Sequence, residues 1–417
     1  MSSKQKVYFK TFGCRTNLYD SQVMMGALKE YDITENESEA DVVVINSCTV
    51  TNGADTHVRS YISQLEKTND AKVFLTGCGA HTKGESLLAS GRVAGVFGQS
   101  EKEKIDSLLK RDKPFYEKGD LNHIDKAVVD NFVGKSRAFI KVQEGCDFRC
   151  SYCIIPFVRG DARSMDEEKI LEQITRLALN GFGEFILTGT NVGSYGKKTG
   201  SSMAKLMKRI SLIRGVRRIR LGSVEPIQID DEFKEILSEP WLEKHLHVAL
   251  QHTSPQMLKN MNRRNVYKQD KELFELLSSK GFAIGTDFIT GHPGESQELW
   301  DEAMNNVRDL PLTHLHAFTY SKRDSTPSAI MKPEVNGKVA KQRLHELEDI
   351  IKEKNYNFRK SFSGELEVLI ESKKDNFFIG YDQHFNKIML ESDEDLLGNW
   401  INIQNYKVQK EYNYASI

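Results

Sequence analysis

Three cysteines lie within a nine-residue segment, GCDFRCSYC, at residues 145–153. Cys146, Cys150 and Cys153 follow a C-x3-C-x2-C spacing, and no fourth cysteine is nearby; His123 precedes the strand that leads into the segment. Structural zinc sites take four ligands, whereas an iron–sulfur cluster held by three thiolates keeps one iron open for a small molecule. The spacing therefore favours a cluster with an open iron, and leaves zinc or a purely structural cluster as alternatives.

The other three cysteines each follow a short apolar segment. Cys14 comes after KVYFKTFG, Cys48 after DVVVINS and Cys78 after KVFLTG, with helical patterns between the segments. This alternation predicts a parallel sheet built by right-handed crossovers. The carboxyl ends of parallel strands share one edge of the sheet, where ligands bind. We expect the three thiols to meet there, with three buried and unreactive cysteines as the alternative.

Composition sets wider limits. A chain of 417 residues with 39% hydrophobic and 28% charged residues is expected to form two or three domains. The net charge of −1 means that a nucleic-acid partner needs a local basic patch. A polar start and the lack of a long apolar run predict a cytoplasmic protein without a membrane partner. Thiols stay reduced there, which favours metal ligation or catalysis over disulfides.

Six further strand patterns alternate with helices between about residues 137 and 320. They read RAFIKVQEG, EFILTGTN, RRIRLGSVEP, HLHVALQHTS, AIGTDFITGHPGE and HLHAFTYSKRD. This is consistent with an incomplete barrel of six β/α units, whose active site is built at the carboxyl ends of its strands. Small or polar residues at those ends are candidate ligands for a cofactor, although each alone could be a turn or capping residue. They are Gly189, Asn191, Ser223, Glu225 and Gln251.

Tyr152 directly precedes the last cysteine of the tight group. This spacing with its aromatic residue resembles the signature of the radical S-adenosylmethionine (SAM) superfamily. The resemblance implies that Cys146, Cys150 and Cys153 hold a catalytic [4Fe-4S] cluster whose open iron chelates SAM. Reduction then yields a 5′-deoxyadenosyl radical, and the five strand-end candidates above would bind SAM.

With both cysteine groups, the whole chain resembles the methylthiotransferase family. The matching segments are TFGCRTNLYDSQ, INSCTVT, LTGCGA, GCDFRCSYCIIPFVRGDARS, LTGTNVGSYG, SVEP, DFITGHPGE and FTYSKRDSTP. The resemblance implies that Cys14, Cys48 and Cys78 bind an auxiliary [4Fe-4S] cluster. One SAM would methylate sulfur carried on that cluster, and a second SAM would supply the radical that activates the substrate carbon.

The expected architecture is α/β. Residues 1–115 are expected to form a doubly wound parallel-sheet domain that binds the auxiliary cluster, and residues 116–134 a linker. Residues 135–360 should form an incomplete (β/α)6 radical SAM barrel with a connecting helix. Residues 361–417 resemble the small C-terminal β-barrel, of TRAM type, that closes these enzymes.

The segment GCRTN is similar to the threonylcarbamoyladenosine (MtaB-type) branch of the family. The resemblance implies methylthiolation at C2 of N6-threonylcarbamoyladenosine beside the tRNA anticodon. Methylthiolation of N6-isopentenyladenosine in tRNA, or of a ribosomal-protein aspartate, is the alternative, and a non-catalytic metal-stabilised RNA-binding protein is a third reading. The implied partners are the tRNA anticodon stem-loop and a flavodoxin- or ferredoxin-like electron donor, and the sulfur donor is not identified.

Two charged regions bear on RNA binding. Residues 197–220 carry nine Lys or Arg and no Asp or Glu, which predicts phosphate contacts unless the run is a solvated helix face. Residues 361–417 carry five Lys and ten Asp or Glu, a formal charge of −5. We expect that the tail either contacts RNA through a few residues such as Lys373 and Lys374, or mainly supports the barrel.

Overall fold

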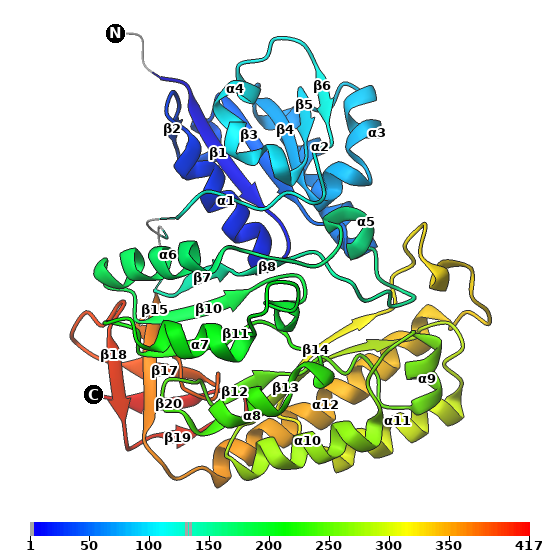
Figure 1. Cartoon of the computed structure of the whole chain (residues 1–417), viewed down its shortest axis with the longest axis vertical. Helices are drawn as coiled ribbons and strands as arrows, with labels where there is room; N and C mark the ends of the chain where they lie inside the picture. The colour runs from blue at the N-terminus through cyan, green and yellow to red at the C-terminus, as the bar shows by residue number, and fades with distance from the viewer. Residues whose placement is uncertain (1–3, 130–131, 133–135) are drawn as a thin grey trace.

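The computed structural model describes residues 4–129, 132 and 136–417 (Figure 1). Its N-terminal part is a parallel sheet with the strand order β2-β1-β3-β4-β5-β6. The strands are β1 (Lys6–Thr11), β2 (Asp32–Ile33), β3 (Val42–Ser47), β4 (Lys72–Gly77), β5 (Gly95–Phe97) and β6 (Phe115–Glu117). The helices are α1 (Arg15–Ala27), α2 (Asn52–Thr68), α3 (Gly84–Ala89) and α4 (Ile105–Leu109).

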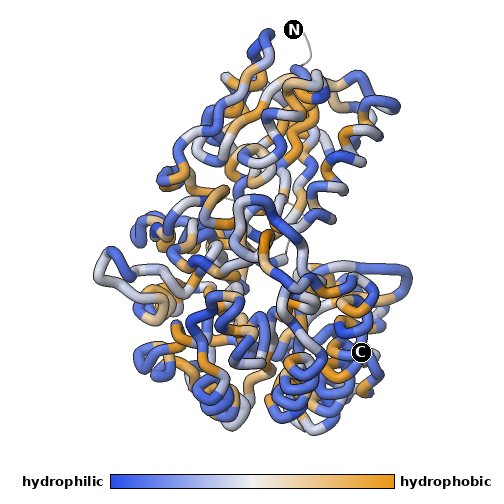
Figure 2. Tube along the Cα trace, turned by 90° about the vertical axis from the view of Figure 1, so that its right-hand side faces the viewer, coloured by the Kyte–Doolittle hydropathy of each residue, from blue (hydrophilic) through white to orange (hydrophobic). Residues whose placement is uncertain are grey.

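The central strand β3 shows why this sheet is doubly wound. All its residues are buried, and alternate side chains point to opposite faces. Val43 and Ile45 belong to a core with α2, whereas Val42 and Val44 belong to a core with α1 and α4. Figure 2 shows the hydrophobic segments running through the interior of this domain. The predicted doubly wound parallel sheet is confirmed.

The central part is a barrel that does not close. Its parallel strands form the ladders β7-β10-β11 and β12-β13-β14, joined by the bridges Ile219–Leu242 and Val224–Val248. The strands are β7 (Ala138–Lys141), β10 (Glu184–Thr188), β11 (Arg218–Leu221), β12 (His245–His247), β13 (Ala283–Thr290) and β14 (His314–Thr319). The edge strands β7 and β14 are not paired with each other, so the incomplete six-stranded barrel is confirmed.

Helices surround this barrel, and a short antiparallel strand pair encloses its cysteine loop. The pair is β8 (Gln143–Glu144) with β9 (Arg163–Ser164). The helices are α5 (Ile155–Arg159), α6 (Glu167–Leu179), α7 (Met203–Ser211), α8 (Asp231–Glu235), α9 (Pro255–Asn260), α10 (Tyr267–Ser279), α11 (Gln297–Asp309) and α12 (Gly337–Ser361). Within the described part of the chain, none of the helices is both long and apolar enough to cross a membrane.

The C-terminal part is a curled sheet with the order β18-β15-β16-β17-β20-β19. Its strands are β15 (Leu366–Lys374), β16 (Phe377–Tyr381), β17 (Lys387–Glu391), β18 (Trp400–Ile403), β19 (Lys407–Val408) and β20 (Asn413–Ser416). The edge strands β18 and β19 do not pair, so the sheet is a half-barrel. The N-terminal sheet was predicted to end at residue 115, but its last strand, β6, continues to Glu117. The predicted boundary between linker and barrel, at residues 134 and 135, lies outside the described residues.

The basic run of residues 197–220 is largely used inside the protein. Arg218 binds Glu367 at 2.7 Å, Arg220 donates to the Asp382 carbonyl at 2.8 Å, and Arg217 lies over the Trp400 ring. Lys198, Lys205, Lys208 and Arg209 also form ion pairs within the barrel part. The predicted phosphate-binding surface on this run stays a prediction, because four of the paired cations are in exposed ion pairs, which are weak. Seven of the nine cations have partners within the protein. Three of them attach the C-terminal sheet to the barrel.

A buried charge cluster joins the N-terminal domain to the barrel. Lys141 of β7 binds Asp20 of α1 at 2.7 Å and Glu144 at 3.0 Å, and it also pairs with Asp125. Lys102 pairs with Asp20 and Asp125 from the N-terminal side. Burial alone would raise the pKa of Asp20, but the cations around it outweigh burial and lower that pKa to about 2. Asp20 therefore stays ionised and holds the two domains together.

We predict that Lys141→Met destabilises the protein by about 3–5 kcal/mol, because three buried carboxylates lose their shared cation. Calorimetry should show a lower melting temperature. The control is Lys110→Met, which removes an exposed ion pair with Glu30 and should leave the melting temperature nearly unchanged. Equal melting temperatures for the two variants would contradict a structural role for the buried cluster.

Candidate active site

The structure brings Cys14, Cys48 and Cys78 to the wall of one cavity. Cys14 is the N-cap of α1, Cys48 follows β3, and Cys78 opens a 3-10 turn after β4. The loop before α1 approaches Cys48 so closely that a Cβ on Gly13 would lie 2.6 Å from the Cys48 Cβ. Gly13 also has a φ of +99°, so glycine is required there for two reasons. The sheet edge thus sets the position of all three thiols.

The surroundings of these thiols suit thiolate ligands. The N-terminal end of α1 carries no acidic residue in its first turn and no side-chain cap, so its partial positive charge faces Cys14 unopposed. Arg159 donates its Nε–H to the Cys78 Sγ at 3.2 Å. Burial raises the pKa of the Cys78 thiol to about 11, so the thiolate form depends on a bound metal. Three thiols with a guanidinium beside them fit an iron–sulfur cluster.

The second trio lies in the loop between β8 and α5, and backbone hydrogen bonds fix this loop. The Cys146 amide donates to the Gly160 carbonyl at 3.0 Å, and the Ser151 amide donates to the Met261 carbonyl at 2.9 Å. The loop begins at Gly145, where an added Cβ would lie 1.9 Å from the Asp161 carbonyl oxygen. Cys146, Cys150 and Cys153 are therefore held before any metal is bound.

Two polar side chains donate to the sulfur atoms of this second trio. Asn191 Nδ2 lies 3.4 Å from the Cys146 Sγ, and Arg263 lies 3.5 Å from the Cys150 Sγ. Burial raises the pKa of the Cys153 thiol to about 12, so again the metal must stabilise the thiolate. Donors aimed at ligand sulfurs are what a cluster site needs in its surroundings. The residues present fit a cluster held by three thiolates.

Four of the five strand-end candidates gather around this trio. Asn191, Ser223, Glu225 and Gln251 line a cavity of about 300 Å³ together with all three cysteines. Gly189 instead lines the neighbouring cavity beside Cys14, Cys48 and Cys78. A Cβ on Gly189 would lie 2.7 Å from the Gln143 carbonyl oxygen, so this glycine allows a close backbone approach.

Sequence reasoning missed two residues that support the second trio. Arg263 donates hydrogen bonds to both carboxylate oxygens of Glu225 and to the Ala249 carbonyl at 2.5 Å. His292 packs edge-on against Tyr152 and binds Ser328 Oγ at 2.7 Å, which in turn binds Ser151 Oγ. His292 lies in the GHPGE segment, for which the sequence analysis predicts no site role, and no local pattern marks Arg263.

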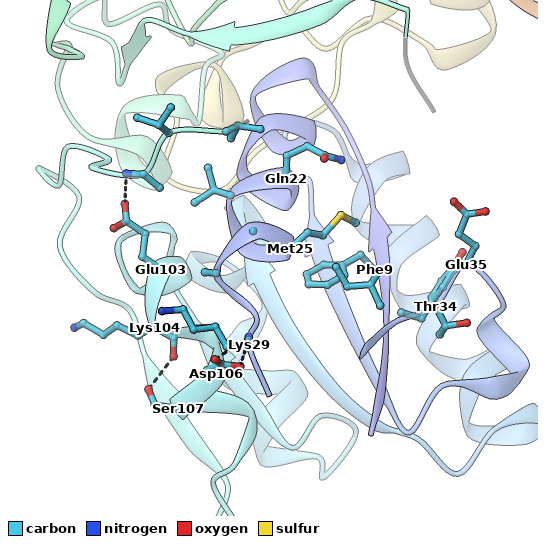
Figure 3. Close-up of a pocket in the computed structure, with 18 residues that line it drawn as sticks. Phe9, Gln22, Met25, Lys29, Thr34, Glu35, Glu103, Lys104, Asp106 and Ser107 are labelled. Carbon is cyan, nitrogen blue, oxygen red and sulfur yellow. Dashed lines mark hydrogen bonds between the residues drawn. The ribbon is translucent and has the colours of Figure 1, made fainter. Parts of the chain in front are cut away.

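The two cavities adjoin each other. They share the wall residues Val50, Ile155, Thr190, Ser223 and Asp287. The cavity beside the N-terminal trio has a volume of about 620 Å³. A third cavity, of about 1160 Å³, lies beside α1 and is lined by residues such as Phe9, Met25 and Lys104 but by none of the cysteines (Figure 3). The two adjoining cavities are therefore the candidate active site.

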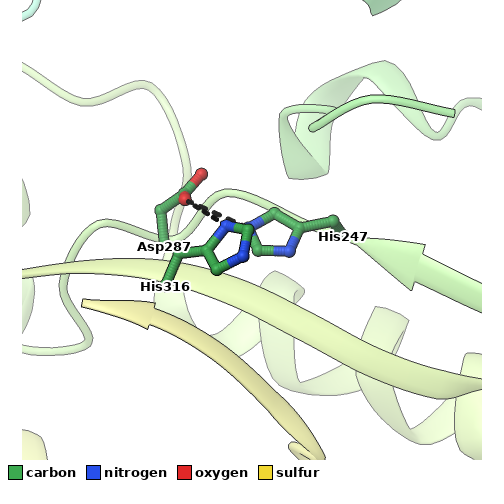
Figure 4. A group of neighbouring side chains, drawn as sticks. All are labelled: His247, Asp287 and His316. Atoms are coloured by element: carbon green, nitrogen blue, oxygen red, sulfur yellow. Dashed lines mark ion pairs between the residues drawn. The ribbon is translucent and has the colours of Figure 1, made fainter. Parts of the chain in front are cut away.

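Charged and imidazole groups line the barrel side of these adjoining cavities. His247 Nε2 lies 3.1 Å from Asp287 Oδ1, and His316 approaches the same carboxylate (Figure 4). Glu243, whose pKa burial raises to about 7, pairs with Arg220 on the same wall. The histidines were not among the predicted site residues.

Comparison with known proteins assigns this site to a family. Residues 6–98 match the family described as "Uncharacterized protein family UPF0004", and residues 140–307 match the radical SAM superfamily. The chain is 33% identical to the threonylcarbamoyladenosine tRNA methylthiotransferase MtaB of Bacillus subtilis, over 98% of this chain and 95% of that protein. The chain belongs to the radical SAM methylthiotransferase family. It uses SAM and holds two [4Fe-4S] clusters.

Other relatives leave the branch of this methylthiotransferase open. A Helicobacter pylori protein with only a provisional methylthiotransferase name is 52% identical over 99% of both chains. The ribosomal protein uS12 methylthiotransferase RimO of Lachnoclostridium phytofermentans is 34% identical over 90% of both. The radical SAM methyltransferase TsrM of Kitasatospora setae has a TM-score of 0.61 at 16% identity, over 79% of this chain and 77% of that chain, and shares the fold alone.

We predict that changing Cys14, Cys48 and Cys78 together to alanine leaves about four iron atoms per chain, half the content of the wild type. SAM cleavage should continue, because the second trio is intact. The matched variant, with Cys146, Cys150 and Cys153 changed to alanine, should also retain about four irons but lose SAM cleavage. Iron analysis with Mössbauer spectroscopy checks both. Loss of all iron in either variant would contradict two independent clusters.

Proposed function

We propose that this methylthiotransferase adds a methylthio group to C2 of N6-threonylcarbamoyladenosine beside the anticodon of tRNA. The observation that carries the proposal is that the two thiol trios line two adjoining cavities with five wall residues in common. A base turned out of its stack could place its C2 between the two clusters. Insertion of sulfur into an unactivated C–H bond needs both a radical and a sulfur donor near the same carbon.

In this proposal the chain positions groups rather than reacting itself. Bound SAM supplies the methyl group and, on reduction, the radical, while the auxiliary cluster carries the sulfur. Asn191, Ser223, Glu225 and Gln251 bind SAM, and Arg263 fixes Glu225 through two hydrogen bonds. Gly189 lets the end of β10 lie close to Gln143, which a side chain at this position would prevent. Buried Phe148 and Ile154 line the SAM side and keep water away from the radical.

The cavity beside the N-terminal trio, which we call the substrate cavity, has a polar wall that favours the threonylcarbamoyl branch. Arg15, Arg220, Glu243, His245 and His247 line it, so its wall beside the N-terminal trio is polar and charged. A threonylcarbamoyl group has a carboxylate, a hydroxyl and ureido N–H groups for such a wall. An isopentenyl group would offer no hydrogen bond to the Arg15 guanidinium or to His245 Nε2, which has no partner among the described residues, and this is unfavourable. The resemblance to MtaB points the same way.

The partners follow from this reaction. The substrate is the anticodon stem-loop of tRNA, and a low-potential protein of the flavodoxin or ferredoxin type supplies electrons in the cytoplasm. Seven cations of the 197–220 run have partners within the protein, and the four in exposed ion pairs remain accessible to RNA. The C-terminal half-barrel supports the barrel through Glu367, Asp382 and Trp400.

We predict that a strain lacking this protein loses 2-methylthio-N6-threonylcarbamoyladenosine from its tRNA and accumulates the unthiolated nucleoside. Mass spectrometry of digested tRNA measures both. The wild-type gene should restore the product, and a Cys48→Ala gene should not. Loss of only the methylthio-isopentenyl nucleoside would overturn the substrate, and unchanged tRNA with altered ribosomal protein S12 would overturn the RNA assignment.

A further inference from the structure

Arg15 is a cation on the wall of the substrate cavity that has no partner among the described residues. Its side chain is half-buried, and it forms no hydrogen bond or ion pair with any residue that the structure describes. Other arginines at the active site are all paired. Arg159 binds Asp20 and Glu144, Arg220 binds Glu184 and Glu243, and Arg263 binds Glu225.

The electrostatic surroundings of Arg15 do not compensate its charge. Burial lowers the pKa of Arg15, and the like charge of Arg137 lowers it further. Glu184 and Glu243 are the nearest acidic groups that act on it, but salt bridges already bind both of them to Arg220. A half-buried guanidinium in such a place is unfavourable unless an anion comes from outside the chain.

Arg15 lines a cavity whose other wall includes the barrel residues Glu243, His245 and His316. The charged groups that act on Arg15 are Arg137, Arg220, Glu184 and Glu243, and all four belong to the barrel. The charges that act on Cys78 are those of Arg159 and the two other cysteines. Arg159 already donates to the Cys78 sulfur. The missing anion of Arg15 is therefore expected in the substrate space rather than on the cluster.

A tRNA phosphate is a poor candidate for this anion, because the backbone lies outside a cavity that a single turned-out base enters. The base itself carries its N6 substituent into the cavity. In the proposed substrate this substituent ends in a carboxylate, whose two oxygens match the planar fork of a guanidinium. We propose that Arg15 is a specificity-determining residue that binds the carboxylate of the N6-threonylcarbamoyl group. This inference rests on the proposed function.

The test compares three synthetic anticodon stem-loops that carry N6-threonylcarbamoyladenosine, its carboxamide analogue or N6-isopentenyladenosine. Binding is measured by fluorescence anisotropy on the enzyme with both clusters, and methylthiolation by mass spectrometry. The wild type should bind the carboxylate RNA about 10- to 100-fold more tightly than the carboxamide RNA. This comparison needs no variant.

Variants of Arg15 then test whether this residue causes the preference for the carboxylate RNA. Arg15→Gln should weaken binding of the carboxylate RNA about 10- to 100-fold and change binding of the carboxamide RNA less than about 3-fold. Arg15→Lys should restore part of the difference, because it keeps the charge but loses the fork. The control is Arg111→Gln, which removes an exposed ion pair in the same domain and should bind all three RNAs like the wild type. Iron content and the EPR spectrum should be those of the wild type in every variant.

Distinct outcomes separate the two proposals. If the wild type modifies the threonylcarbamoyl RNA but binds the carboxylate and carboxamide forms equally, the role of Arg15 is wrong and the proposed function stands. If Arg15→Gln weakens both forms equally or loses iron, Arg15 serves the fold or the cluster instead. If the wild type modifies only the isopentenyl RNA, both proposals are overturned.

Discussion

The guanidinium of Arg159 is the interaction on which the two-cluster arrangement depends. This arginine is only 2% exposed and ends α5, the short helix that follows the second trio. It donates to the Cys78 sulfur at 3.2 Å, to Asp20 at 2.9 Å and to Asn17 at 2.5 Å, all in the N-terminal domain. It also pairs with Glu144, next to the cysteine loop of the barrel. The Arg159 side chain therefore contacts the cysteine region of the N-terminal domain and also the cysteine loop region of the barrel.

This constraint explains why so much charge is buried between the domains. A lone buried arginine would be strongly unfavourable, but Asp20 and Glu144 neutralise it, and Lys102 and Lys141 balance those carboxylates together with Asp125. Burial alone would raise the pKa of Glu144, but the cations around it, Lys141 first, hold that pKa well below its usual range. The network keeps the domains at a fixed spacing, which an apolar interface would specify less strictly. The contact between the two cavities is a consequence of that spacing.

Regular patterns made most of the fold predictable. Period-two and buried strand segments with helices between them located β1, β3, β4 and the six barrel strands, and the strand ends located the cysteines. Patterns within one segment cannot show which charges meet across domains. The run of nine cations looked like an RNA surface, yet Arg217, Arg218 and Arg220 bind the C-terminal sheet. Arg263 and the histidines of β12 and β14 were missed for the same reason, because their partners lie far away in sequence.

Arg159 couples the two clusters by holding their ligand regions at two adjoining cavities. A direct test is the ratio of 5′-deoxyadenosine to methylthiolated RNA produced by Arg159→Met with both clusters loaded. We predict that SAM cleavage stays within about 3-fold of the wild type while methylthiolated product falls at least about 10-fold, since the loss of a buried charged contact costs about 2–5 kcal/mol in positioning. If both products fell together, Arg159 would act on the SAM cluster itself. If the ratio stayed at the wild-type value, the coupling role would be contradicted.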